Sequence, residues 1–127
     1  MTYRVVGSIN IRYLDNILLN NLGAGLSHEI GYDAVVAGNW AAGNGKAFQI
    51  WLWSGQIQIQ NSRNTIVRNN TVVVGEGYAN GICIIQQNRN CAGCLPGHSG
   101  ASPMPAVNNT VTNNVMVFDD CHGTNGE

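Results

Sequence analysis

The stretch that decides the fold is IQIQNSRNTIVRNNTVVV, residues 57–74. On both sides of Asn70 its apolar residues alternate with polar ones, as they do in β-strands that bury one face. Val67 precedes Asn70 by three positions and Val72 follows it by two. The stretch therefore predicts a strand, a sharp corner at asparagine and a second strand.

Four segments share this pattern, and each has asparagine in its second place: residues 15–18, 38–41, 69–72 and 113–116. The asparagines are Asn16, Asn39, Asn70 and Asn114. Asparagine tolerates the left-handed backbone region, and its side-chain amide can hydrogen-bond to the same amide one coil above and one coil below. We therefore predict stacked coils in which the four asparagines form a ladder at one corner.

A third strand in each repeat is predicted over residues 25–30, 55–60 and 80–85. Alternation along these strands predicts an inward set of Leu26, His28, Ile57, Ile59, Ile82 and Ile84, and an outward set of Ser27, Glu29, Gln58, Gln60, Cys83 and Ile85. The first spacing between corner asparagines fits one solenoid coil of roughly 20 or more residues. The later spacings are larger and indicate insertions over residues 43–54 and 87–106, which both adjoin the third strand. A helical fold is excluded because Asn and Gly recur every few residues.

The composition excludes several classes of protein. Hydrophobic residues make up 44% of the chain but charged residues only 10%, and the apolar residues are spread throughout, which argues against a disordered tail. A net charge of −1 with six Lys and Arg argues against a nucleic-acid surface. No apolar run is long enough for a membrane span, and the amino terminus shows no secretion signal.

Three stretches of the sequence carry a family resemblance, residues 23–45, 57–74 and 80–89. They resemble the right-handed parallel β-helix repeat family, which is the pectate-lyase-like superfamily of polysaccharide lyases, glycoside hydrolases and epimerases. Within this superfamily they are similar to uncharacterised bacterial secreted members. The resemblance covers most of residues 18–118. It implies an all-β fold, a right-handed parallel β-helix of about four to five coils with two loop insertions. The whole chain, 1–127, is then one such domain or a fragment of a longer β-helix. The resemblance also implies that carbohydrate is bound or processed in a groove, and that the protein is secreted or periplasmic.

The two insertions are expected to wall a groove over the outward face of the third strands, because long loops on a rigid scaffold commonly carry function. Trp51 and Trp53 in the first insertion could stack on sugar rings, although both could instead fold back as packing. The remaining candidate sugar-binding residues are Gln58, Gln60, Gln86, Lys46 and Arg89. An amide row that merely stiffens the face is the alternative for the glutamines.

Glu29 is the only carboxylate expected on the outward face, and Tyr32 and Asp33 follow in the next turn. Asp33 could join Glu29 in a catalytic site or could simply hold the turn through an Asx bond. His28 aligns with inward residues, which favours an interior histidine over a catalytic base. Glycoside hydrolysis needs a second carboxylate, and lyase chemistry needs a base together with Ca²⁺ or Arg to neutralise a uronate carboxyl. The acidic calcium cluster of the family has no counterpart in this sequence.

The cysteines leave three alternatives open. Cys91 and Cys94 form a C-x-x-C pair in the second insertion, and Cys121 and His122 follow the last strand. This set could bind Zn²⁺, a disulfide could join Cys91 or Cys94 to Cys121, or the thiols could be free. Cys83 lies within a strand and is interpreted as a small packing residue, because no base is paired with it.

Two classes of function follow from these features. One is a carbohydrate-active β-helix with a polysaccharide or oligosaccharide as its partner. The other is a non-catalytic structural solenoid, because the sequence shows no capping helix before the first coil and only a polar tail after residues 115–118. Open strand edges pair with other strands, so we expect a homo-oligomer joined through the coil ends.

Overall fold

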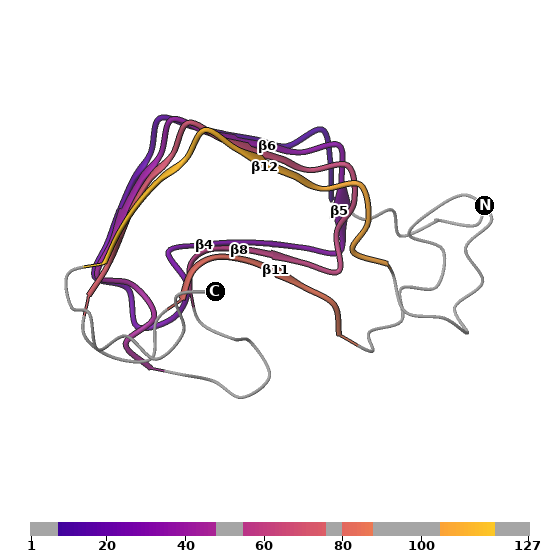
Figure 1. The fold of residues 1–127 in the computed structure, drawn as a ribbon. Coiled ribbons are helices and arrows are strands. Elements are labelled where there is room, and N and C mark those ends of the chain that lie inside the picture. Colours follow the sequence, from indigo (N-terminus) through magenta and orange to yellow (C-terminus); the bar gives the residue numbers. More distant parts are fainter. Residues whose placement is uncertain (1–7, 48–54, 76–79, 88–104, 119–127) are drawn as a thin grey trace, which may run out of the picture.

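The computed structural model describes residues 8–47, 55–75, 80–87 and 105–118, and within these ranges the chain is all-β (Figure 1). All strand pairs in this part of the chain are parallel. None of these described residues forms a helix that is long and apolar enough to cross a membrane. The predicted all-β class is therefore confirmed for the described chain.

The strands of the described residues form four sheets. The first pairs β1 (Ser8–Ile9) with β5 (Gly31–Tyr32). The second contains β2 (Arg12–Leu14), β6 (Val35–Ala37), β9 (Ile66–Arg68) and β12 (Thr110–Thr112). The third contains β3 (Ile17–Leu19), β7 (Trp40–Ala42), β10 (Thr71–Val74) and β13 (Val115–Phe118). The fourth contains β4 (Leu26–Glu29), β8 (Gly55–Gln60) and β11 (Asn80–Ile85).

The chain visits these sheets in a constant order, which divides it into levels. Level 1 is β1–β4, level 2 is β5–β8, level 3 is β9–β11 and level 4 is β12–β13. Each level lies on the one before it, and the traces of successive levels follow one another around a shared interior (Figure 1). This arrangement is consistent with a parallel β-solenoid. The sequence predicted three strands per repeat and missed the short β1–β5 pair, which an isolated bridge from Tyr32 to Arg63 extends into level 3.

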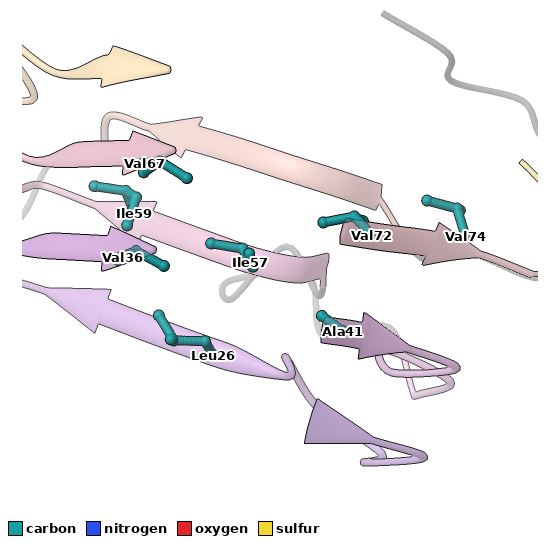
Figure 2. Packing of buried hydrophobic residues seen from close by; sticks show 8 residues of the cluster. All are labelled: Leu26, Val36, Ala41, Ile57, Ile59, Val67, Val72 and Val74. Carbon is teal, nitrogen blue, oxygen red and sulfur yellow. The ribbon is translucent and has the colours of Figure 1, made fainter. Parts of the chain in front are cut away.

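The core lies between the sheets and is built from inward positions at successive levels (Figure 2). Its buried apolar residues are Leu26, Val36, Ala41, Ile57, Ile59, Val67, Val72 and Val74. The predicted register of the third strands is confirmed, since Leu26 pairs with Ile57 and Ile57 with Ile82. Ile84 differs from the prediction of a buried residue, because it is 42% exposed. Its strand, β11, is an edge strand of its sheet, with no described strand beyond it.

The predicted asparagine ladder is present. Asn39 Oδ1 accepts hydrogen bonds from the backbone N–H of Asn16 at 3.0 Å and from Asn16 Nδ2 at 2.9 Å. Asn70 Oδ1 accepts the same two bonds from Asn39, and Asn114 Oδ1 accepts them from Asn70. The second Nδ2 proton of each acceptor residue bonds to a carbonyl of the preceding level, as Asn70 Nδ2 does to Val36 O at 3.1 Å. The bonds between asparagines therefore all have the same direction, with the donor in the earlier level and the acceptor in the later one.

The left-handed corner residue is not the one that the sequence predicted. The positive φ angles occur one position earlier, at Asp15, Gly38, Asn69 and Asn113. Gly38 leaves room at this corner for the Asp15 side chain, because a Cβ would lie 2.1 Å from Asp15 Oδ1 and that side chain would have to move. The left-handed backbone position and the inward amide belong to two successive residues for a physical reason. The left-handed residue turns the chain outward, and the asparagine that follows is thereby directed into the interior, where its amide can stack.

A second, shorter ladder was not predicted. Asn44 Oδ1 accepts bonds from the backbone N–H and Nδ2 of Asn21, and Gln56 Oε1 accepts the same pair from Asn44 at 3.1 and 2.8 Å. Gln56 belongs to the same level as Asn44, so its side chain ends this ladder in place of an asparagine from level 3. Gly25 is needed beside it, because a Cβ would lie 2.6 Å from Asn44 Nδ2.

Replacing Asn70 with leucine is expected to lower the free energy of unfolding by about 1–3 kcal/mol, because buried donors and acceptors lose their partners. The side chain of Asn70 is only 1% exposed, so water cannot replace those partners. The matched control is Asn16→Leu at the open end of the same ladder, where only the Nδ2 bond to Asn39 is lost and the residue is exposed. Urea unfolding of both variants measures the difference. An unchanged stability for Asn70→Leu would contradict the ladder.

Candidate functional site

The outward face of the sheet β4–β8–β11 carries the polar rows that the sequence predicted. Ser27, Gln58 and Cys83 form one row in register. Glu29, Gln60 and Ile85 form the next row. The structure therefore brings Glu29, Gln58 and Gln60 together, as expected.

The two glutamines are buried, which the sequence did not indicate. Gln58 and Gln60 have no solvent exposure. Gln58 Nε2 donates to Gln60 Oε1 at 2.8 Å, and Gln60 Nε2 donates to Gln87 Oε1. This chain of amides corresponds to the alternative in which the glutamines stiffen the face. Their role in sugar binding stays a prediction, and a sugar would reach them only if the atoms that cover them moved.

The two candidate acids have different surroundings. Glu29 is partly buried at the end of β4 beside Gln60. Asp33 occupies a left-handed corner with φ 59°, and its Oδ1 accepts a hydrogen bond from Asn64 Nδ2 at 3.0 Å. Asp33 thus links two levels through this bond. Among the described residues there is no cluster of three His, Cys, Asp or Glu side chains that could hold a metal ion.

His28 lies in the interior, as its alignment with Ile59 predicted, and is 1% exposed. Tyr13 Oη lies 3.3 Å from Nδ1, and the two rings meet edge to face with centroids 5.7 Å apart. Nε2 is buried and finds no hydrogen-bond partner among the described residues. Gly31 makes room for the ring, because a Cβ there would lie 2.4 Å from Cε1. Burial lowers the pKa of His28 and raises the pKa of Tyr13, since both charged forms would lose water.

Cys83 is a packed thiol. It lies next to Gln58 in register, and a Cβ at Gly55 would lie 3.2 Å from its Sγ. Burial raises the pKa of the Cys83 thiol to about 11. The protonated form therefore dominates at neutral pH, which agrees with the prediction of a packing residue and not a nucleophile.

The other candidates divide into described and undescribed residues. Lys46 is exposed, and its Nζ donates to Asn20 Oδ1 at 3.4 Å. Gln86 is exposed after β11, and its Oε1 accepts the backbone N–H of Ala106 at the end of the second insertion. The predicted residues that lie outside the described part of the chain are Trp51, Trp53, Arg89, Cys91, Cys94, Cys121 and His122. The predicted groove walls fall mostly in the same undescribed segments.

The sheet β3–β7–β10–β13 has an apolar outer face that was not predicted from the sequence, and we call it the Trp40 face. Its outward rows are Ile17, Trp40, Thr71 and Val115, and Leu19, Ala42, Val73 and Val117. Trp40 lies in level 2, away from either end of the stack, yet it is 51% exposed. The sequence does contain a signal for it, because Trp40 directly follows a corner asparagine and precedes an inward alanine.

The comparisons with known proteins give no match, whether among protein-family models, among curated proteins or among solved structures. The resemblance to the parallel β-helix repeat family therefore stays a prediction that rests on the repeat.

The buried His28 predicts a pH-dependent stability. Its pKa is lower in the folded state than the unfolded value of 6.5. The contribution of the neutral His28 to the free energy of unfolding is therefore fully present above pH 6.5 and decreases as the pH falls below that value. Urea unfolding between about pH 7 and pH 5 should show the decrease, with the unfolded pKa of about 6.5 as its upper limit. Replacing His28 with isoleucine, which matches its neighbour Ile59, should remove this contribution. An identical pH dependence in both proteins would contradict the burial of a neutral imidazole.

Proposed function

We propose that the chain forms a right-handed parallel β-helix that binds carbohydrate, with Trp40 as the stacking platform. The fold proposal is supported by the constant order of the sheets, by the parallel pairing and by the directional amide ladder. Connections between parallel strands of one sheet are right-handed in nearly all proteins, which supports the handedness. The family resemblance adds a secreted or periplasmic location to the proposal.

The observation that carries the binding proposal is the exposure of Trp40. A half-exposed indole on a sheet offers a rigid apolar plane at little cost in conformational entropy, and a sugar ring can stack on it. Trp40 lies between Ile17 and Thr71 in its outward row, so the ring stands on a regular strand and not on a loop. An exposed apolar patch around a tryptophan commonly marks a binding site.

Polar groups lie at one edge of the same face. Asn20 directly follows β3, and Lys46 follows β7 by four residues, so both come after strands whose carboxyl ends share one edge of the sheet. Their side chains are joined by the Lys46–Asn20 hydrogen bond and remain exposed. An ammonium and an amide at this edge could bond to the hydroxyls or carboxylates of a sugar stacked on Trp40. Lys46 thereby keeps the binding role that the sequence predicted for it.

The chemistry of the described residues favours binding over cleavage. Glu29 is the only carboxylate on the described strands of the sheet β4–β8–β11, whereas hydrolysis by the common route needs two acids across the bond. His28, the nearest candidate base in sequence, is enclosed in the core. We therefore propose a binding segment, with Glu29 and Asp33 as the residues to test if cleavage is found.

Replacing Trp40 with alanine is expected to weaken polysaccharide binding at least several-fold, because the stacking plane is lost. Affinity electrophoresis and calorimetry with neutral and acidic polysaccharides, with and without Ca²⁺, measure the effect. The matched control is Ile66→Ala, an outward residue on another sheet that is 40% exposed. Binding that survives Trp40→Ala but is lost in Trp51→Ala or Trp53→Ala would move the site to the first insertion. The absence of binding to any polysaccharide would contradict the proposed function.

A further inference from the structure

The two ends of the stack expose side chains that belong to the rows of the core. Val111 and Met116 in level 4 continue the inward rows of Val67 and Val72, yet they are 44% and 50% exposed, whereas Val67 and Val72 are fully buried. At the opposite end, Tyr13 and Leu18 in level 1 pack against the core but are only partly buried. Each end of the stack therefore exposes side chains that belong to the rows of the core.

The strand edges at these ends are also unpaired within the described residues. In their sheets, β2 and β3 stand at one edge, and β12 and β13 stand at the other. A strand edge carries free backbone N–H and C=O groups, which pair readily with another strand. The outward rows next to these edges are apolar as well, because Ile17 is 74% exposed and Val115 is 56% exposed.

The amide ladder gives the two ends complementary hydrogen-bonding groups. At every interior step, one asparagine donates its backbone N–H and one Nδ2 proton to the Oδ1 of the next asparagine. Asn114, the last member, has used its Oδ1 for Asn70 and one Nδ2 proton for Val67 O. Its backbone N–H and second Nδ2 proton have no partner in the described chain. Asn16, the first member, has an Oδ1 that accepts no bond from the described residues.

We infer that level 4 of one copy stacks on level 1 of a second copy, head to tail. In this arrangement the two idle donors of Asn114 meet the idle acceptor of Asn16 in the second copy, and the ladder continues with the geometry it has inside the chain. Strands β12 and β13 then pair in parallel with β2 and β3 of that copy. The rows match. Tyr13 of the second copy would lie beside Val111, as it lies beside Val36 within its own chain. Leu18 of the second copy would lie beside Met116, as it lies beside Ala41 within its own chain.

The other two arrangements lack this match. Stacking of level 1 on level 1 would oppose two Asn16 side chains, where each idle oxygen could meet only the one idle Nδ2 proton of the other copy and no idle backbone N–H. Stacking of level 4 on level 4 would oppose two sets of donors without an idle amide oxygen. Both arrangements would also make the strand pairing between the copies antiparallel, whereas every strand pair in the described residues is parallel. Head-to-tail contacts along the axis of the stack do not close into a ring, so the expected product is a chain of copies that grows with concentration.

Paired cysteine substitutions test the order of the ends. Position 115 and position 17 of a second copy would occupy neighbouring outward positions, with a Cα–Cα separation of about 4.8 Å as in any paired strands, which suits a disulfide. Under mild oxidation the double variant I17C/V115C should form a series of dimers, trimers and larger species. Each single variant alone should form no new species, and an equimolar mixture of the two should stop at the dimer. Peptide mass spectrometry identifies the link between positions 17 and 115 and separates it from links through the native cysteines.

Each outcome decides the inference. A disulfide that joins position 115 of two V115C copies, or position 17 of two I17C copies, would show the opposite orientation and overturn it. So would light scattering that gives a monomer at all concentrations up to about 100 µM, a range in which specific interfaces of ordinary affinity associate. Polysaccharide binding is measured separately through Trp40→Ala, so failure of either proposal leaves the other standing.

Discussion

The structure depends on the way in which Asn39 and Asn70 satisfy all of their polar groups by contacting the levels on both sides. Each is 1% exposed, so water cannot serve as a substitute partner. Each amide oxygen accepts two bonds and each amide nitrogen donates two, and the backbone N–H joins the same set. A buried polar group without a partner costs roughly 1–3 kcal/mol, so the levels are held at the spacing and register that keep every one of these bonds. The parallel sheets, the aligned core rows and the position of Trp40 on its strand all follow from that register.

The corners explain why the repeat is so rich in asparagine, aspartate and glycine. At each corner of the ladder the chain uses one residue with positive φ and one inward asparagine, as in the pairs Asn69–Asn70 and Asn113–Asn114. Residues that tolerate the left-handed region are few, which limits the first position to Asp15, Gly38, Asn69 and Asn113. Ile30, with φ 49°, is the exception among the left-handed residues, since a β-branched side chain adopts this region only at a cost. Its backbone N–H bonds to Gln60 O of the next level, which holds the strained residue in place.

Periodicity predicted the parts of the structure that repeat and missed those that occur once. The ladder of Asn16, Asn39, Asn70 and Asn114 and the pairing of Leu26 with Ile57 follow from alternation, because a shift by one residue would place every core side chain on the outside. The burial of Gln58 and Gln60 could not be predicted this way, since alternation states which face a residue occupies and not what covers that face. The end of the second ladder at Gln56 arises from an insertion, so no repeat indicates it. The outward position of Trp40 follows from alternation, because the residue lies between the corner Asn39 and the inward Ala41, but alternation does not state how exposed an outward side chain is. For Trp51 and Trp53 the first insertion carries no periodic pattern, so their roles stay predictions.

Hydrogen exchange of the asparagine side-chain amides, followed by NMR, tests the account at its central point. Because an exchanging Nδ2 proton must first break its bond, the amides of Asn39 and Asn70 should exchange only when the stack opens, at rates similar to those of the backbone amides of the core strands. The side-chain amide of Asn16 is exposed at the open end of the ladder and should exchange faster in the same sample at low protein concentration. Equally fast exchange at Asn16, Asn39 and Asn70 would show that no buried ladder joins the levels, and would contradict the account.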